Sequence, residues 1–287
     1  MDAFDYSRAF SRNIGWVTEA EQQILQRSRI AIAGLGGVGG SHLLTLTRLG
    51  IGAFHISDFD RFEQQNFNRQ AGAFVSHLHQ DKCAVLARMA ADINPQATLK
   101  AFPQGINDDN LSAFLDGVDV YVDSLDFFAV DIRRKVFAAC AARGIPALTA
   151  APLGMGTAFL AFLPGGMSFE QYFRMEGLPK TEQLARFIAG LSPRMFQRPY
   201  LQVPEAVNFS KEKGPSTAMA CELCAGVMGV EVLKVLLKRG RVTAAPWGLH
   251  FDAYRQRYKK TWRPFGNANP LQKILIALIR SKLNLNG

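Results

Sequence analysis

Cysteine is scarce in this sequence, and long apolar runs are missing. Four cysteines in 287 residues exclude a disulfide scaffold and favour a reducing compartment. The apolar runs fall well short of the roughly 18 residues that a membrane-spanning helix needs. The opening MDAFDYSRAF contains Asp2 and Asp5 and no apolar stretch, so no secretory signal is expected. The sequence therefore predicts a soluble, cytoplasmic protein.

Acidic residues are almost absent from the C-terminal end. Residues 234–287 contain 12 Lys and Arg against the single acid Asp252, a net charge of +11. Residues 1–150 carry a net charge of −2 and residues 151–233 carry none, so the excess of +9 belongs to this end alone. Such a distribution indicates a local basic patch or tail rather than a surface that is basic throughout.

The first half of the chain alternates between short apolar runs and segments of helical periodicity. The run 29–34 leads into a glycine-rich turn, an apolar helix over 38–50 and a second run over 53–60, which together form a βαβ unit. Continued alternation predicts an α/β fold, a doubly wound Rossmann-like sheet that is mostly parallel. The other elements expected here are helices at 82–93, 108–116 and 129–144 and strands at 98–103, 119–124 and 145–151.

The pattern changes after residue 151. No crossover helix precedes the strand expected over 156–164, so we expect the sheet to continue in antiparallel fashion. Residues 165–215 are irregular apart from one helix near 180–190, and long loops of this kind are more often functional than not. We expect one domain over 1–265 and a basic amphipathic tail over 266–287. The remaining elements expected are a helix at 216–240, a hairpin of strands 248–254 and 256–262, and a tail helix that starts at Pro270.

The turn GLGGVGG carries the clearest chemical signal. Gly34, Gly36 and Gly39 form a G-x-G-x-x-G pattern between a strand and a helix, with Gly37 inside the same turn. Glycines allow the backbone to approach a phosphate closely, and the helix start offers free N–H groups. Asp58 ends the second strand, where an acid can bind ribose hydroxyls. The sequence predicts a nucleotide site here.

Several charged and polar residues near this turn point to a triphosphate rather than to NAD. Asn66, Arg69 and Lys82 follow the second strand, and a nicotinamide site has little need for them. Arg and Lys neutralise the charge that develops when an α-phosphate is attacked. Asp126, just after the strand 119–124, is suited to holding Mg²⁺ or positioning that phosphate.

These motifs together resemble the ThiF/MoeB family, adenylyltransferases related to the ubiquitin-activating enzyme. The resemblance rests on GLGGVGG, DFD (58–60), NFNRQ (66–70), Lys82 with INP (93–95), and DSLD (123–126). It implies a homodimer of Rossmann-like subunits that binds Mg·ATP and adenylates a carboxylate, commonly the C-terminal glycine of a ubiquitin-like carrier protein.

The same resemblance implies roles for individual residues. The glycines of the turn would shape the phosphate loop, and Asp58 with Asp60 would bind the nucleotide. Asn66, Arg69 and Lys82 would contact phosphates, and Asp126 would hold magnesium. The segment YSRA (6–9) resembles the Tyr-x-Arg-Gln segment of the family, so Arg8 would reach the ATP site of the partner subunit, although Ala9 replaces the glutamine.

The sequence also departs from the family pattern. It has no cysteine between 141 and 220 and none after 224, which excludes the four-thiolate zinc site of many members. We therefore expect no structural zinc and no catalytic thioester. Cys221 and Cys224 lie three apart in an expected helix, which favours packing. Phe127 replaces the usual asparagine after the second Asp of DSLD, so the substrate side is expected to differ from that of sulfur-carrier enzymes.

Several functions remain open at this level. The first is adenylation of a carrier protein, peptide or small carboxylic acid. The alternatives are an enzyme like the tRNA threonylcarbamoyladenosine dehydratases, to which the basic end would help bind tRNA, and an NAD-dependent oxidoreductase. For the tail we consider docking on its own subunit or dimer partner, binding of an acidic partner protein, and peripheral contact with an anionic membrane.

Overall fold

The computed structural model describes residues 3–208, 212 and 214–282. Its contacts divide the chain into two compact units. The first comprises residues up to 125 together with 225–242, and the second comprises 126–224 and the residues from 243 onward. Each unit is described by itself below. None of the helices in the described ranges is both long and apolar enough to cross a membrane.

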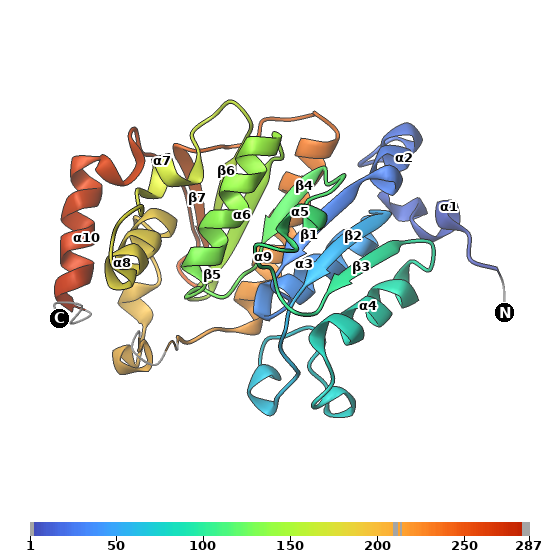
Figure 1. The fold of residues 1–287 in the computed structure, drawn as a ribbon, viewed down its shortest axis with the longest axis horizontal. Helices are drawn as coiled ribbons and strands as arrows, with labels where there is room; N and C mark the ends of the chain where they lie inside the picture. Colours follow the sequence, from blue (N-terminus) through green and yellow to red (C-terminus); the bar gives the residue numbers. More distant parts are fainter. Residues whose placement is uncertain (1–2, 209–211, 213, 283–287) are drawn as a thin grey trace. The chain divides into compact units, whose positions relative to one another are not determined.

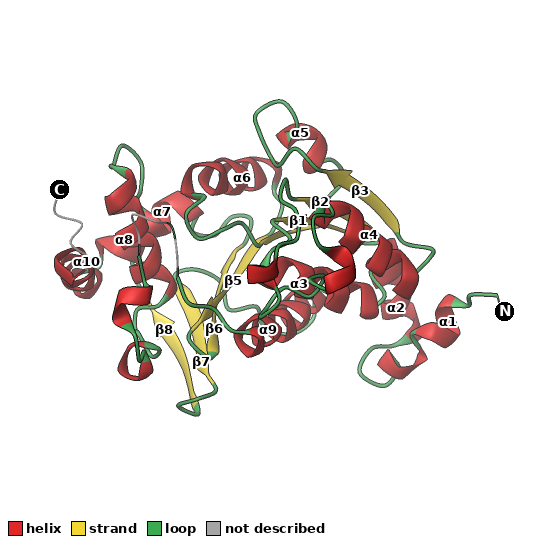
Figure 2. Ribbon diagram, turned by 90° about the horizontal axis from the view of Figure 1, so that it is seen from below, coloured by secondary structure: helices red, strands yellow, loops and turns green. Residues whose placement is uncertain are grey.

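The first unit is built on four parallel strands in the order β3-β2-β1-β4. Their bounds are β1 Arg29–Ala33, β2 Ala53–Ser57, β3 Thr98–Phe102 and β4 Val120–Asp123. Buried side chains run along β1 and β4 almost without interruption, as parallel strands covered on both faces require. Figure 2 shows α3 (Gly37–Arg48) and α4 (Lys82–Ile93) on one face of these strands and α5 (Leu111–Phe114) on the other.

Two short helices precede β1, α1 (Tyr6–Ala9) and α2 (Glu19–Arg27). Sequence periodicity did not predict α2. Its start is fixed by a capping box, in which Thr18 accepts a hydrogen bond from the N–H of Glu21 and Glu21 accepts one from the N–H of Thr18. The T-x-x-E spacing was therefore the signal for this helix.

The second unit contains four antiparallel strands in the order β5-β6-β7-β8. They span β5 Ala147–Leu153, β6 Gly156–Phe162, β7 Trp247–Asp252 and β8 Arg257–Trp262. The helices of this unit are α6 Val130–Arg143, α7 Phe169–Phe173, α8 Lys180–Leu191 and α10 Pro270–Lys282. The helix α9 (Ala218–Leu236) has residues in both units. An aromatic cluster of Phe137, Phe162, Phe169, Phe173 and Phe187 packs between the helices and β6.

The expected fold class is confirmed: parallel Rossmann-like strands come first in the chain, and antiparallel strands follow. Two parts of the segment 165–215 were not predicted, the helix α7 and the short 3-10 turns Arg198–Tyr200 and Pro204–Ala206. The domain boundary expected at 265 remains a prediction.

The tail helix starts at Pro270 as predicted and docks within the second unit. Ile276 and Ile279 of α10 are buried against Ala185 and Ala189 of α8. The Nε2 of Gln272 donates to the carbonyl of Ala189. Figures 1 and 2 both show α10 beside α8. Docking on its own chain is thus the interaction that the structure contains for this face of the helix.

Candidate nucleotide-binding site

The glycine-rich turn lies between the end of β1 and the start of α3, and two of its glycines are required by the fold. Gly34 has a φ of +85°, and a Cβ there would collide with the carbonyl oxygen of Ser124. A Cβ on Gly39 would collide with the carbonyl of Gly34. The N–H of Ser124 in turn donates to Ala33 O at 2.9 Å. These glycines therefore let the turn pack directly on the end of β4.

Gly36 is not required for packing in this way. The nearest atom to a Cβ at this position is Nε2 of Gln70, at an ordinary contact distance of 3.7 Å. Gly36 is also the N-cap of α3 and provides no side-chain cap, and Gly37 is the first residue of the helix. The N–H groups of a first helical turn have no partners within the helix and attract anions. The space over Gly36 therefore suits a phosphate group.

Asp58 is held against the glycine turn by hydrogen bonds. Its Oδ2 accepts from the N–H of Leu35 at 2.7 Å, and its Oδ1 accepts from the N–H of Asp60 at 2.8 Å. Burial raises the pKa of Asp58, and the nearby Lys82 charge works in the opposite direction. Each carboxylate oxygen keeps a second lone pair that can accept from a hydroxyl. The structure therefore places this acid beside the turn, and its predicted contact with a ribose stays a prediction.

Lys82 opens α4, and its side chain lies next to both acids. Its Nζ lies 2.8 Å from Oδ2 of Asp60, and the lysine side chain is only 5% exposed whereas that of Asp60 is 52% exposed. Its backbone N–H also donates to the carbonyl of Asp60. An ammonium group has three donors, so Lys82 can hold Asp60 and still contact an anion.

Asn66 and Arg69 lie on the loop between β2 and α4. Asn66 is buried in the 3-10 turn Gln64–Asn66, and its Oδ1 accepts from the N–H of Glu63 at 2.9 Å. The side-chain oxygen of Asn66 therefore forms a hydrogen bond within the turn. The Nη1 of Arg69 donates to the carbonyl of Gln65 and to Oδ1 of Asn68, which orients the guanidinium without pairing it to a carboxylate. The predicted phosphate contacts of both residues remain predictions.

Gln70 belongs with these residues, although sequence reasoning did not single it out. It is 7% exposed, its Nε2 is the atom nearest to the open position over Gly36, and its buried Oε1 has no hydrogen-bond partner among the described residues. Buried polar atoms are normally paired, so an unpaired one beside a candidate site points to a ligand. The signal was available as the last residue of NFNRQ.

Asp126 and Arg8 complete the predicted set. Asp126 opens the second unit and is exposed, with its Oδ1 accepting from the N–H of Phe128 at 2.9 Å. The buried Arg133, which the sequence analysis did not identify, donates from Nη2 to the carbonyl of Asp126 at 3.0 Å and lies over the Phe187 ring. It therefore fixes the backbone that carries Asp126. Arg8 is exposed on α1, and its predicted reach into a partner subunit remains a prediction.

The four cysteines are buried and unbonded to one another. Burial raises the pKa of Cys83 to about 11, and its Sγ donates to the carbonyl of Asp58 at 3.3 Å. Cys224 donates to Oγ1 of Thr157 at 3.1 Å, and Cys221 is likewise fully buried, which confirms the packing interpretation of this pair. Within the described ranges, no group of three or more His, Cys, Asp or Glu side chains could hold a metal ion.

Two curated proteins are similar to about half of this chain. The chain is 30% identical over 143 residues to the sulfur carrier protein ThiS adenylyltransferase of Escherichia coli (strain K12), covering 50% of this chain and 56% of that protein. It is also 30% identical over 141 residues to the tRNA threonylcarbamoyladenosine dehydratase of Bacillus subtilis (strain 168), covering 49% of this chain and 55% of that protein. The chain thus spans little more than half the length of these two curated relatives.

The fold has counterparts among solved structures. The crystal structure of E. coli MccB with ATP superposes with a TM-score of 0.67 at 17% identity, covering 92% of this chain and 73% of that one. At this level of identity the likeness shows the fold. The family match itself extends over residues 10–273, nearly the whole chain. This protein therefore belongs to the ThiF family.

Proposed function

We propose that this protein is an ATP-dependent adenylyltransferase that activates a carboxylate. In the reaction, a carboxylate oxygen attacks the α-phosphorus of ATP, the bond to the β-phosphate oxygen breaks, and pyrophosphate leaves with the acyl-adenylate as product. The observation that carries the proposal is the geometry of the glycine turn. The position over Gly36 is open, and the carboxylate of Asp58 is held by the N–H of Leu35 in the same turn. Membership of the ThiF family supports it.

The chain's own residues have distinct tasks in this proposal. The first turn of α3 receives phosphate oxygens, and Asp58 accepts from ribose hydroxyls. The buried ammonium of Lys82 and the guanidinium of Arg69 stabilise the charge that develops on the α-phosphate and on the departing pyrophosphate. The Nε2 of Gln70, beside Gly36, is a further donor at the same position.

Magnesium would bind through Asp126. Mg²⁺ in nucleotide sites uses one or two carboxylates together with phosphate oxygens and water, so a single exposed carboxylate fits it. One oxygen of Asp126 is used by the N–H of Phe128, which leaves the other for a ligand. The ion when bound neutralises part of the triphosphate charge. No structural zinc is proposed.

The substrate is proposed as a carrier protein, a peptide or a small acid. The ThiS adenylyltransferase of E. coli acts on a sulfur carrier protein by name, which supports a carrier. We further propose a homodimer in which Arg8 contacts the nucleotide of the partner subunit. An NAD-dependent oxidoreductase is disfavoured because the buried Lys82 ammonium beside the glycine turn serves a triphosphate better than a nicotinamide dinucleotide.

A second candidate is a tRNA-modifying dehydratase. The similarity to the B. subtilis tRNA threonylcarbamoyladenosine dehydratase is as high as that to the ThiS adenylyltransferase. The exposed basic strand β8, with Arg257 and Lys259, is an additional reason to keep tRNA among the candidate partners.

ATP–pyrophosphate exchange tests the proposal. Purified protein is assayed with Mg·ATP, labelled pyrophosphate and a panel of carrier proteins, peptides and small acids, and exchange that depends on one of them is expected. Asp126→Asn should abolish it, whereas Asp109→Asn, an exposed acid on a loop of the first unit, should not. ATP consumption only with threonylcarbamoyl-tRNA would favour the dehydratase. Binding of NAD without binding of ATP would overturn both.

A further inference from the structure

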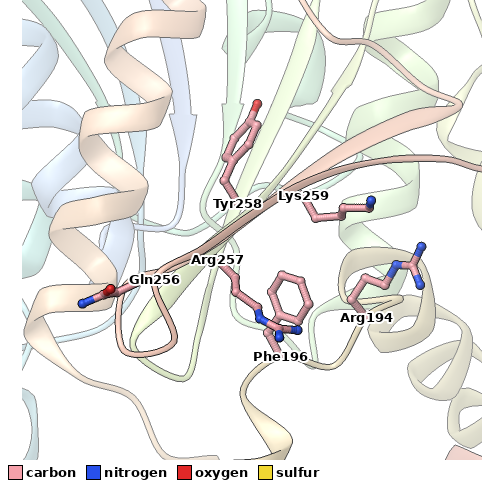
Figure 3. Close-up of a pocket in the computed structure, with 6 residues that line it drawn as sticks. All are labelled: Arg194, Phe196, Gln256, Arg257, Tyr258 and Lys259. Atoms are coloured by element: carbon pink, nitrogen blue, oxygen red, sulfur yellow. The ribbon is translucent and has the colours of Figure 1, made fainter.

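Three of the six residues that line a pocket in the second unit are cations. Its lining residues are Arg194, Phe196, Gln256, Arg257, Tyr258 and Lys259. Four of these come from strand β8 and the turn before it, and two come from the segment after α8. Figure 3 shows Arg194, Arg257 and Lys259 grouped around Phe196, while Tyr258 extends from the other side of the strand. Alternation along the strand places Arg257 and Lys259 on the same face.

The cations of this pocket form no ion pair with the described acids. None of the six lining residues is acidic, and no ion pair involves Arg194, Arg257 or Lys259 within the described part of the chain. The one acid between 234 and 287, Asp252, is fully buried. Its carboxylate accepts from the hydroxyl of Tyr200 and the N–H of Arg255, both at 2.8 Å. Its hydrogen bonds are therefore directed to these two groups.

A further cation of the second unit, Arg263, is buried and lies outside the residues that line the pocket. Arg263 is 4% exposed, and its Nη2 has no hydrogen-bond partner among the described residues. Its Nη1 reaches the hydroxyl of Tyr172 only at 3.5 Å. Burial lowers the pKa of Arg263, and the charge of Arg194 lowers it further. A buried charged nitrogen without a partner is costly, and a bound anion would relieve that cost.

Phe196, which lines the pocket, packs against a buried histidine ring. The Phe196 ring lies 4.8 Å from the ring of His250, which is 2% exposed. Burial lowers the pKa of His250 to about 4, so this imidazole is neutral at pH 7 and adds no charge. The guanidinium of Arg255 lies 5.9 Å from the Phe196 centroid. The ring of Phe196 therefore packs between a neutral imidazole and the guanidinium of Arg255.

We propose that this pocket binds a ligand that carries several phosphate groups. Guanidinium forks bind phosphate oxygens in pairs, and a cluster rich in arginine suits phosphate better than a cluster of lysines would. The pocket is distinct from the glycine turn, and the proposal is independent of the proposed adenylation. The phosphates come either from a free oligophosphate compound or from the backbone of a nucleic acid, since both present the same chemistry.

Two probes distinguish these sources. Tripolyphosphate is titrated into the protein by calorimetry with saturating AMP, which keeps the nucleotide site occupied. A labelled 20-nucleotide oligouridylate is titrated separately by fluorescence anisotropy. We expect at least one probe to bind, and its affinity to fall as salt rises. Binding of the oligouridylate indicates a nucleic acid backbone, and binding of tripolyphosphate alone indicates a free oligophosphate.

The variant Arg194→Gln/Lys259→Gln removes two charges from the pocket. It should lower the affinity for the probe by about tenfold or more, since each charge-assisted hydrogen bond contributes strongly to binding. The matched control Arg241→Gln/Lys273→Gln removes two exposed charges elsewhere in the basic end and should change the affinity less than about twofold. The single variant Arg257→Gln changes an exposed side chain of the pocket and should also weaken binding of the probe.

Three results would overturn the proposal. The first is that neither probe binds the wild-type protein. The second is an equal loss in the pocket variant and the control, which would indicate non-specific attraction to net charge. The third is displacement of the bound probe by hexaglutamate as efficiently as by unlabelled tripolyphosphate, which would mean that the pocket does not select phosphate.

Discussion

The two glycines Gly39 and Gly36 make opposite predictions, because one is required by packing and the other is not. In Gly39→Ala the added Cβ meets the backbone carbonyl of Gly34 and comes within 3.1 Å of the Cβ of Ser124. A backbone carbonyl cannot rotate away as a side chain can. Overpacking costs about 1–3 kcal/mol, and the close backbone contact puts this site at the upper end. The gain in helix propensity from Gly to Ala offsets about 1 kcal/mol of this destabilisation.

The expected net loss for Gly39→Ala is therefore about 2 kcal/mol in the free energy of unfolding. In a chain of this size that corresponds to a fall in Tm of about 4–8 °C. For Gly36→Ala, the only contact is at 3.7 Å, so the stability should change by less than about 1 kcal/mol. Its Cβ would occupy the space that a phosphate needs, so the affinity for ATP should fall at least about tenfold.

Urea denaturation followed by tryptophan fluorescence measures the first effect, and calorimetric titration with ATP measures the second. Each variant is the control for the other. If Gly39→Ala is as stable as the wild type, the packing argument for the turn is wrong. If Gly36→Ala binds ATP within twofold of the wild type, phosphates do not approach the backbone at the start of α3.

Three further predictions use other parts of the molecule. Lys82→Met should lower the rate of pyrophosphate exchange by a factor of about 10²–10³. It should cost at most about 1 kcal/mol in stability, because its partner acid is half exposed. Lys100→Met is the surface control, and near-normal exchange in Lys82→Met would show that this lysine is not part of the site. Cys83, with its pKa raised to about 11, should resist iodoacetamide at pH 8 in the folded protein, and rapid labelling detected by mass spectrometry would contradict this. Deletion of residues 268–287 should lower the free energy of unfolding by about 3 kcal/mol or more, since it exposes the apolar surface of α8 that α10 covers. The control Leu271→Ser, on the exposed side of α10, should change thermal stability little. An unchanged Tm after the deletion would refute the docking.

Local patterns predicted most of the elements. Apolar runs marked β1, β2 and β4 to within a few residues, because parallel strands that are buried on both faces read as continuous apolar segments. The absence of a helix between β5 and β6 predicted their antiparallel pairing, since only antiparallel strands can be joined by a tight turn. The helix α2 was missed because its signal was a capping box and not an apolar stripe.

Candidate residues were found where a motif carried the chemistry. Asp58 and Lys82 stood out by charge and position, and the structure places them together. Gln70 did not stand out although it ends the motif NFNRQ, and Arg133 did not because no sequence pattern shows that a single arginine is buried. Only the fold shows that Gln70 lies against Gly36 and that Arg133 holds the carbonyl of Asp126.

By itself, the sequence determined the order of strands and helices, the glycine turn, and the accumulation of positive charge after residue 234. These features depend on neighbours in the chain, so local periodicity and composition reveal them. The tertiary structure decided which glycine is needed for packing, because the carbonyl that excludes a Cβ at Gly34 belongs to Ser124, ninety positions away along the chain. It also brought Arg194, from the segment after α8, to one pocket with Arg257 and Lys259 of β8. Long-range proximity of this kind arises from packing alone, which no local pattern in the sequence encodes.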